Sequence, residues 1–168
     1  MNKYLVIGNP IEHSLSPLLH NHWFEKHKIS NSIYERRKVE KKDLKKIVEQ
    51  VRNGEIKGVN VTVPFKKEIF NYIDDSSNEV QLTKSVNTLV KEDNKVVGYN
   101  TDQGGFEISL RENKWSSQNK KILILGAGGV TSSILSSFIK ANGVVKIYLC
   151  NRTREKAEEL KTLWDKAV

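Results

Sequence analysis

A glycine-rich turn in the C-terminal half of the chain constrains the fold more than any other feature. Residues 121–125 are a short apolar run typical of a buried strand, and Gly126-Ala127-Gly128-Gly129 follows at once. Residues 130–140 are typical of a helix, and residues 144–150 of a second strand after an Asn142-Gly143 turn. This order predicts a βαβ unit, the building block of open α/β sheets.

The chemistry of this unit points to a phosphate ligand. Glycines let the backbone approach a pyrophosphate, whose charge is attracted by the N-terminus of the following helix. The third fingerprint position is Thr131 instead of Gly or Ala, so the match is incomplete. Asn151-Arg152-Thr153-Arg154 and Lys156 follow the second strand. Basic and hydroxyl groups there suit a 2′-phosphate, which favours NADP(H) over NAD(H), although an ordinary basic helix start is the alternative.

A second informative stretch lies in the N-terminal half. Residues 59–63 alternate β-branched and polar side chains, as in a strand with one buried face. Pro64 suits the first turn of a helix, and residues 65–73 have apolar side chains at helical spacing. Because ligands bind at the carboxyl ends of strands in open α/β sheets, we expect Lys66 to do proton chemistry. Helical spacing places its neighbour Lys67 on a different face.

Further strands and helices are predicted along the rest of the chain. Strands are expected at residues 3–7, 32–39, 85–90 and 95–99, with a hairpin turn at 92–95, and helices at 17–27, 42–53 and 104–111. Ser14 and Ser16 precede Pro17, and their hydroxyls either cap the next helix or hold an anion at its N-terminus. Asp102 either starts the helix at 104–111 or belongs to a site.

Composition narrows the class of protein. The chain has 168 residues, 38% hydrophobic and 29% charged, which describes a soluble globular protein. Its 28 basic and 20 acidic residues give a net charge of +8, which favours anionic partners. Basic residues concentrate at 36–46, and the lysines at 41, 42, 45 and 46 are typical of the solvated face of an amphipathic helix. The sequence lacks the interleaved aromatics and the zinc-ligand spacing that would support nucleic-acid or metal binding. The single Cys150 excludes an internal disulfide, and no targeting or membrane segment is evident, so we expect a cytoplasmic protein.

Taken together, the motifs resemble those of shikimate dehydrogenases, in the same order along the chain. They are Gly8-Asn9-Pro10 with His13-Ser14-Leu15-Ser16-Pro17, Asn60-Val61-Thr62-Val63-Pro64-Phe65-Lys66, Asn87-Thr88, Asn100-Thr101-Asp102, Gly126-Ala127-Gly128-Gly129 and Asn151-Arg152-Thr153. The resemblance implies reduction of 3-dehydroshikimate to shikimate by NADPH, in aromatic amino-acid biosynthesis. It also implies an α/β substrate domain with a mixed, mainly parallel sheet flanked by helices, followed by an incomplete Rossmann βαβ unit.

The resemblance assigns roles by position. Lys66 and Asp102 resemble the catalytic pair. The groups that hold the substrate would be Ser14 and Ser16 for the carboxylate, and Thr62, Lys66, Asn87 and Asp102 for the ring hydroxyls. Those that hold NADP would be Gly126, Ala127, Gly128, Gly129 and Val130 at the pyrophosphate, and Asn151, Arg152, Thr153 and Lys156 at the adenosine phosphate. Ser133 stands where the family often has alanine.

The expected domains are residues 1–103 for shikimate binding, 104–120 as a linking helix and boundary, and 121–168 as the start of the NADP-binding domain. Because the sequence stops at Val168, we expect a truncated chain with a folded substrate domain and little or no dehydrogenase activity. A quinate or dual quinate/shikimate dehydrogenase and a non-catalytic shikimate- or NADP-binding fragment are the alternatives. We expect a monomer or homodimer, and no nucleic-acid or membrane partner.

Overall fold

The computed structural model describes residues 1–141 and 143–165, so Asn142 of the expected turn and the chain end at Val168 lie outside the described residues. The strands are β1 (Asn2–Gly8), β2 (Ser32–Lys38), β3 (Gly58–Val61), β4 (Asp75–Ser76), β5 (Thr88–Glu92), β6 (Lys95–Tyr99), β7 (Lys121–Leu125) and β8 (Lys146–Cys150). The α-helices are α1 (Ser16–Lys26), α2 (Leu44–Arg52), α3 (Asn78–Thr83), α4 (Asp102–Glu112), α5 (Thr131–Lys140) and α6 (Arg154–Asp165). Short 3₁₀ helices are η1 (Lys41–Asp43) and η2 (Glu68–Tyr72). Within the described ranges, every helix is too short or too polar to span a lipid bilayer.

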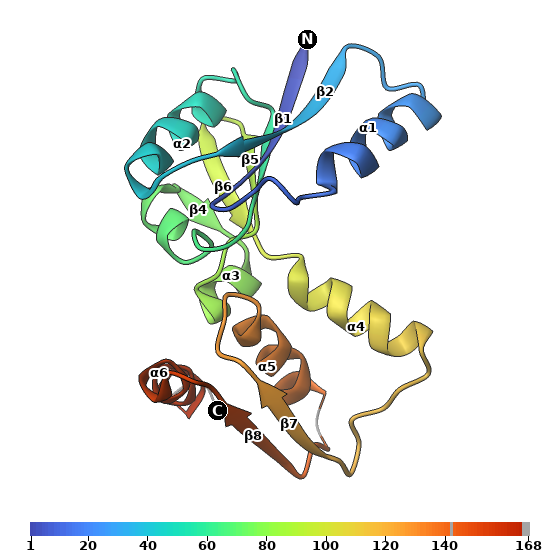
Figure 1. Ribbon diagram of the computed structural model, residues 1–168, viewed down its shortest axis with the longest axis vertical. Coiled ribbons are helices and arrows are strands. Elements are labelled where there is room, and N and C mark those ends of the chain that lie inside the picture. Colours follow the sequence, from blue (N-terminus) through green and yellow to red (C-terminus); the bar gives the residue numbers. More distant parts are fainter. Residues whose placement is uncertain (142, 166–168) are drawn as a thin grey trace.

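The larger sheet has six strands in the order β2-β1-β3-β5-β6-β4. β1 runs parallel to β2 and β3, β5 is antiparallel to β3 and β6, and β4 is parallel to β6. This arrangement confirms the mixed, mainly parallel sheet that we predicted. Helices lie on both faces, with α2 on one side and α1 on the other (Figure 1). The main core, which includes Leu5, Val48, Val61 and Leu89, lies on the α2 side.

The second sheet pairs β7 with β8 in parallel, and α5 forms the crossover between them. This confirms the predicted βαβ unit. Leu135 of α5 and Leu160 and Trp164 of α6 form a small core with β7 and β8 side chains. α4 connects the two sheets and packs on α5, where the rings of Phe106 and Phe138 meet edge to face at 5.5 Å (Figure 1). The two parts of the chain are therefore in direct contact.

The helix expected from residue 65 is wrong. The chain instead makes a turn over residues 63–67 and then the 3₁₀ helix η2. The Lys66 carbonyl accepts a hydrogen bond from the Val86 N–H at 2.8 Å, so a long-range contact uses the oxygen that an α-helix would pair with Phe70. The strand expected at 85–90 begins only at Thr88, which leaves Asn87 just before it. β4 and α3 were not predicted.

Candidate active site

Lys66 and Asp102 form an ion pair at the carboxyl-terminal edge of the larger sheet. Lys66 lies in the turn after β3, and Asp102 is the first residue of α4, shortly after the end of β6. Lys66 Nζ lies 2.6 Å from Asp102 Oδ2, and the two side chains are 14% and 19% exposed. A partly dehydrated ammonium is thus held against a carboxylate, as a proton donor beside a ligand site would be.

Asn87 holds the second oxygen of that carboxylate. Its Nδ2 donates to Asp102 Oδ1 and to Thr101 Oγ1, both at 2.9 Å, and its Oδ1 accepts from the Thr101 N–H at 3.0 Å. The Asn87 backbone is fixed between two strands, because its N–H donates to Tyr99 and its carbonyl accepts from Val61. The structure therefore brings Asn87 together with the pair, as a brace for Asp102.

The loop after β1 lies at the same edge. A Cβ at Gly8 would lie 2.6 Å from Thr62 Cγ2, so only glycine permits this close approach of β1 to the end of β3. The Asn9 N–H donates to the Val63 carbonyl, which fixes the start of the loop. Thr62 therefore lies beside the β1 turn.

The two serines of that loop remain candidates for an anion site. Ser14 Oγ accepts from the Ser16 N–H at 3.3 Å, and the N-cap of α1 is Leu15, without a side-chain cap. The prediction that the serine hydroxyls cap α1 is therefore wrong in detail. Within the described residues, neither serine bonds to Lys66 or Asp102, so the structure does not join the serines directly to the pair.

A cleft of about 420 Å³ separates the Lys66 turn from the glycine turn. Its lining includes Ala127, Gly128, Gly129 and Lys156 from the predicted cofactor residues, together with Lys66. A Cβ at Gly129 would lie 3.5 Å from Lys66 Cδ, so the two walls are close. Lys67 also lines the cleft, contrary to the helical spacing, because the segment is not an α-helix. This second cation was not predicted.

Thr131 accounts for the incomplete glycine fingerprint. Its hydroxyl accepts from the Gly128 N–H at 3.0 Å and donates to the Gly126 carbonyl at 3.1 Å, so a side chain closes the turn. Gly126 has φ +112°, which requires glycine. The Ala127 N–H donates to Asn151 Oδ1 at 3.0 Å. Asn151 therefore braces the turn from the end of β8.

The other predicted cofactor residues lie outside the cleft. Val130 is the N-cap of α5 and is 42% exposed. Arg152 and Thr153 are exposed on the loop after β8. Among the described residues, the predicted cofactor-binding residues thus fall into two groups. One group lines the cleft beside Lys66, and the other lies outside the cleft, where the distant end of an extended ligand would reach it.

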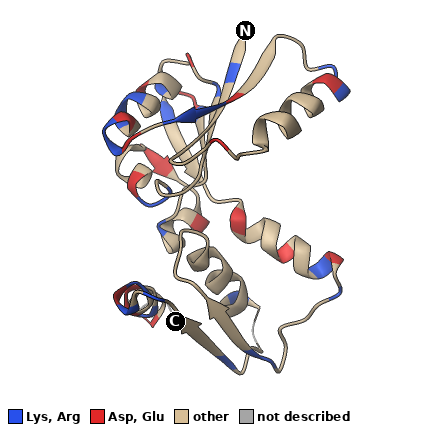
Figure 2. Cartoon of the chain, in the orientation of Figure 1, with Lys and Arg blue, Asp and Glu red and all other residues tan. Residues whose placement is uncertain are grey.

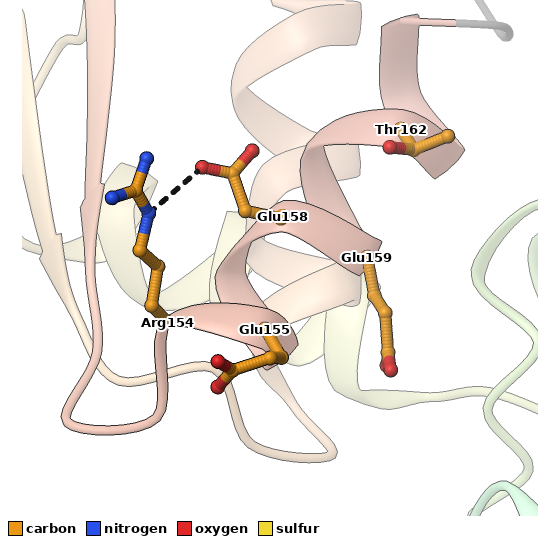
Figure 3. Close-up of a pocket in the computed structure, with 5 residues that line it drawn as sticks. All are labelled: Arg154, Glu155, Glu158, Glu159 and Thr162. Atoms are coloured by element: carbon orange, nitrogen blue, oxygen red, sulfur yellow. Dashed lines mark hydrogen bonds and ion pairs between the residues drawn. The ribbon is translucent and has the colours of Figure 1, made fainter.

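A separate hollow on the outer face of α6 does not fit a phosphate (Figure 3). Arg154 Nε lies 3.4 Å from Glu158 Oε1, and Glu155 and Glu159 also line the hollow. Three carboxylates around one guanidinium make the local charge negative, which would repel an anion.

Buried hydrogen bonds fasten the glycine turn and α5 to the larger sheet. Ser85 Oγ donates to the Gly129 carbonyl at 3.0 Å, and Asn100 Nδ2 lies 2.9 Å from Ser133 Oγ. Asn100 Oδ1 also accepts the Asp102 N–H at 3.0 Å. Ser85 carried no signal in the sequence, whereas Ser133 was noted only as a residue where the family often has alanine.

The basic residues are spread along the chain (Figure 2). They are distributed over several elements, including β2 and α2. The buried side chains of α2 are Leu44, Ile47, Val48 and Val51, so its lysines lie on the solvated side as predicted. This charge pattern supports the predicted amphipathic helix.

Comparison with known proteins gives consistent matches in both parts of the chain. A family model described as "Shikimate dehydrogenase substrate binding domain" matches residues 6–89, and one described as "Shikimate / quinate 5-dehydrogenase" matches residues 109–167. The NADP(+) shikimate dehydrogenase of Pelagibacter ubique is 50% identical over 158 residues, which cover 94% of this chain and 59% of that protein.

Solved structures of shikimate dehydrogenases match the chain as well. Shikimate dehydrogenase from Aquifex aeolicus superposes with a TM-score of 0.88 at 37% identity, over 97% of this chain and 60% of that one. The Thermus thermophilus enzyme, solved in complex with NADP(H) and shikimate, gives 0.86 at 28% identity over 98% and 61%. The 168 residues thus span about 60% of the length of these relatives. With both family models matched and this level of identity, the chain belongs to the shikimate dehydrogenase family.

Proposed function

We propose that the protein is an NADP-dependent shikimate dehydrogenase that interconverts 3-dehydroshikimate and shikimate in aromatic amino-acid biosynthesis. The observation that carries this proposal is the Lys66–Asp102 pair beside a cleft whose opposite wall is the glycine turn. Residues 1–103 would bind the substrate and residues 121–168 would begin the NADP-binding part, joined by residues 104–120. The relatives' names and their complexes with NADP(H) and shikimate support the assignment.

The residues present fit the cofactor. The only side chain of the glycine turn is the Ala127 methyl group, and no neighbouring atom lies within 4 Å of a Cβ built at Gly128. Three lysines and two glutamates line the same cleft, so its lining has a net positive charge; they are Lys66, Lys67, Lys156, Glu68 and Glu159. NADPH, when bound, supplies the hydride. Arg152, Thr153 and Lys156 would hold the adenosine phosphate, which favours NADP over NAD.

The side chains then handle the substrate and its proton. Ser14 and Ser16 would hold the carboxylate, while Thr62 and Asn87 would orient the ring hydroxyls. A ketone oxygen that receives negative charge needs a proton, and the Lys66 ammonium both stabilises the charge and donates that proton. Asp102 holds Lys66 in place and accepts a hydrogen bond from a ring hydroxyl. Each residue type therefore has a defined task in the reaction.

The test is a steady-state assay with shikimate or quinate, each with NADP or NAD, of the 168 residues alone, expected to turn over slowly or not at all, and of the same residues in a chain as long as the relatives. We expect NADP reduction with shikimate to have the highest kcat/KM, and Lys66→Met to abolish most of it. Lys95→Met is the matched control, because Lys95 pairs with Asp75 on the surface of the hairpin. Preferential oxidation of quinate would support the alternative substrate. Binding of shikimate by calorimetry without turnover would support a non-catalytic binding protein.

A further inference from the structure

A polar chain crosses the face of the larger sheet that α1 partly covers, and it ends on the Lys66–Asp102 pair. The Tyr34 hydroxyl on β2 donates to Asn60 Oδ1 on β3 at 2.6 Å. Asn60 Nδ2 donates to Thr88 Oγ1 at 3.1 Å, and the Thr88 hydroxyl donates to Asn87 Oδ1 at 3.0 Å. Asn87 in turn donates to Asp102. We call this sequence of hydrogen bonds the Tyr34–Asp102 relay.

Backbone groups fix the direction of the relay. A side-chain amide alone has two nearly indistinguishable orientations. The Thr101 N–H can only donate, so the Asn87 side-chain atom 3.0 Å from it must be the oxygen. The Asn87 backbone carbonyl can only accept, so the Asn60 side-chain atom 3.4 Å from it must be the nitrogen. With both amides fixed, the Thr88 hydroxyl must accept from Asn60 and donate to Asn87.

The orientation of Asn87 matters for the charge at the site. In the observed orientation its NH₂ group faces the Asp102 carboxylate at 2.9 Å. A flipped amide would place an oxygen against that carboxylate, and its NH₂ group against the Thr101 N–H. Such a flip costs the hydrogen bonds on both sides and would leave buried polar groups unpaired. The Thr88 hydroxyl accepts from Asn60 and donates to Asn87 Oδ1, so together with the Thr101 N–H it favours the amide orientation that keeps Asp102 in position.

The first member of the relay is a stable donor. Tyr34 is 5% exposed, and burial raises the pKa of its phenol, so the hydroxyl keeps its proton. The His20 ring packs edge-on at 4.1 Å from the Tyr34 ring. Burial lowers the pKa of His20, so this neighbour favours the neutral imidazole. Hydrogen bonds in a directed chain strengthen one another.

We propose that Thr88 is a positioning residue for the dehydrogenase reaction, acting through Asn87 on Asp102 and thereby on Lys66, with Tyr34 supporting it through Asn60. This inference rests on the function proposed above. Thr88 lines a hollow on the α1 side of the sheet and not the cleft beside the glycine turn. Its hydroxyl therefore affects turnover by orienting the pair, and the affinity for shikimate much less.

Kinetics of four variants test the proposal. Thr88→Val should lower kcat about fivefold to twentyfold, the range for one or two lost hydrogen bonds, with KM for shikimate changed less than about threefold. Thr88→Ser should restore kcat to within about twofold, because the hydroxyl returns. Tyr34→Phe should lower kcat by a smaller factor, in the same direction. Ser137→Ala is the control, since this buried hydroxyl donates to the Ser133 carbonyl within α5, away from the relay.

A purely structural role predicts a different outcome, in which Thr88→Val and Ser137→Ala both lower the melting temperature and leave kcat of the folded protein equal. That result, or a Thr88→Ser variant as slow as Thr88→Val, would overturn the proposal. If Thr88→Val does not fold, the relay is tested by comparing kcat of Tyr34→Phe with kcat of Tyr99→Phe. The second variant is the control, because the Tyr99 hydroxyl bonds Glu92 outside the relay. Equal kcat in those two variants would then contradict the relay.

Hydrogen exchange of the Asn87 side-chain NH₂ group, measured by ¹⁵N NMR, gives a readout without turnover. Thr88→Val should accelerate this exchange about tenfold, because the amide loses one of the bonds that fix it. Unchanged exchange would contradict the relay. If the unsubstituted protein does not reduce NADP with shikimate, the proposed function fails, while the exchange rates still decide whether Thr88 orients Asn87.

Discussion

At the scale of single residues, two neighbouring lysines line the same cleft but have different surroundings. Lys66 is paired with Asp102 at 2.6 Å and partly buried, whereas Lys67 is exposed. We expect Lys66→Met to lower kcat by about 10²- to 10⁴-fold, the contribution of a positioned proton donor, with a smaller loss of shikimate affinity. Lys67→Met should instead raise KM for NADP about twofold to fivefold by removing one cation near the diphosphate.

Steady-state kinetics with both substrates varied measure these effects, and Lys95→Met controls for the loss of a surface charge. A Lys66→Met protein with kcat within about tenfold of the unsubstituted enzyme would exclude Lys66 as the proton donor. Salt dependence separates the neighbours further, because screening weakens the Lys67 effect.

The two lysines also show what could be predicted at this scale. Lys66 followed from its position after a strand of alternating polarity. The place of Lys67 in the cleft did not follow, because its prediction assumed an α-helix. In the structure, the Lys66 carbonyl accepts from the Val86 N–H instead of from a helical partner. Tyr34 carried no local signal, and Thr88 stood out only in the Asn87-Thr88 motif, because the roles of both depend on strands that are distant in sequence.

At the scale of elements, α5 contains buried serines with different hydrogen bonding. Ser133 Oγ lies 2.9 Å from Asn100 Nδ2, whereas Ser136 Oγ, also buried, has no partner among the described residues. Ser133→Ala should lower the free energy of unfolding by about 1–3 kcal/mol because Asn100 loses a buried partner. Ser136→Ala should be neutral or stabilising, since it removes an unpaired hydroxyl. Chemical denaturation measures both, and equal losses would contradict the Ser133–Asn100 bond.

Asp74 connects α2 to the edge of the larger sheet and gives a pH-dependent prediction. Its pKa is lowered first by the Val96 N–H, which donates to Oδ2 at 2.7 Å, and then by the Arg52 guanidinium. A carboxyl with a lowered folded-state pKa stabilises the fold above its unfolded pKa, near 3.8, and the stabilisation is lost as pH falls through the folded value.

Asp74→Asn should therefore cost about 0.5–1 kcal/mol at pH 7, a value reduced for solvent screening because the side chain is 35% exposed. The difference from the unsubstituted protein should shrink below about pH 4, as the carboxyl gains its proton. Urea unfolding at a series of pH values checks this, with Asp93→Asn at the hairpin turn as the control. A constant difference from pH 7 to pH 3 would contradict it.

At the scale of the whole molecule, the positions of several strands and helices could be predicted from the sequence, whereas their packing around the cleft could not. The strands at β1, β6 and β7 and the helix α1 follow from short-range patterns, and the structure has them within a residue or two of their predicted bounds. The cleft does not follow from such patterns, because Lys66 and the glycine turn are brought together by packing of α4 on α5 and by the Ser85–Gly129 bond.

Because one cleft has walls from both parts of the chain, shikimate and NADP should bind cooperatively. Lys66 is paired with Asp102 and lies against the glycine turn, so a ligand that orders one wall would prepare the other. We expect saturating NADP to lower the dissociation constant for shikimate about threefold to tenfold, and shikimate to lower that for NADP by the same factor, as linkage requires.

Calorimetry with each ligand in the presence of the other measures this coupling. Ser85→Ala should reduce it, because the Ser85 hydroxyl fastens the Gly129 carbonyl to the larger sheet at 3.0 Å. Ser76→Ala is the control, since Ser76 Oγ bonds Gln81 far from the glycine turn. If Ser85→Ala keeps the full coupling while shikimate still binds, the coupling does not depend on this bond, and the packing of α4 on α5 would have to carry it alone.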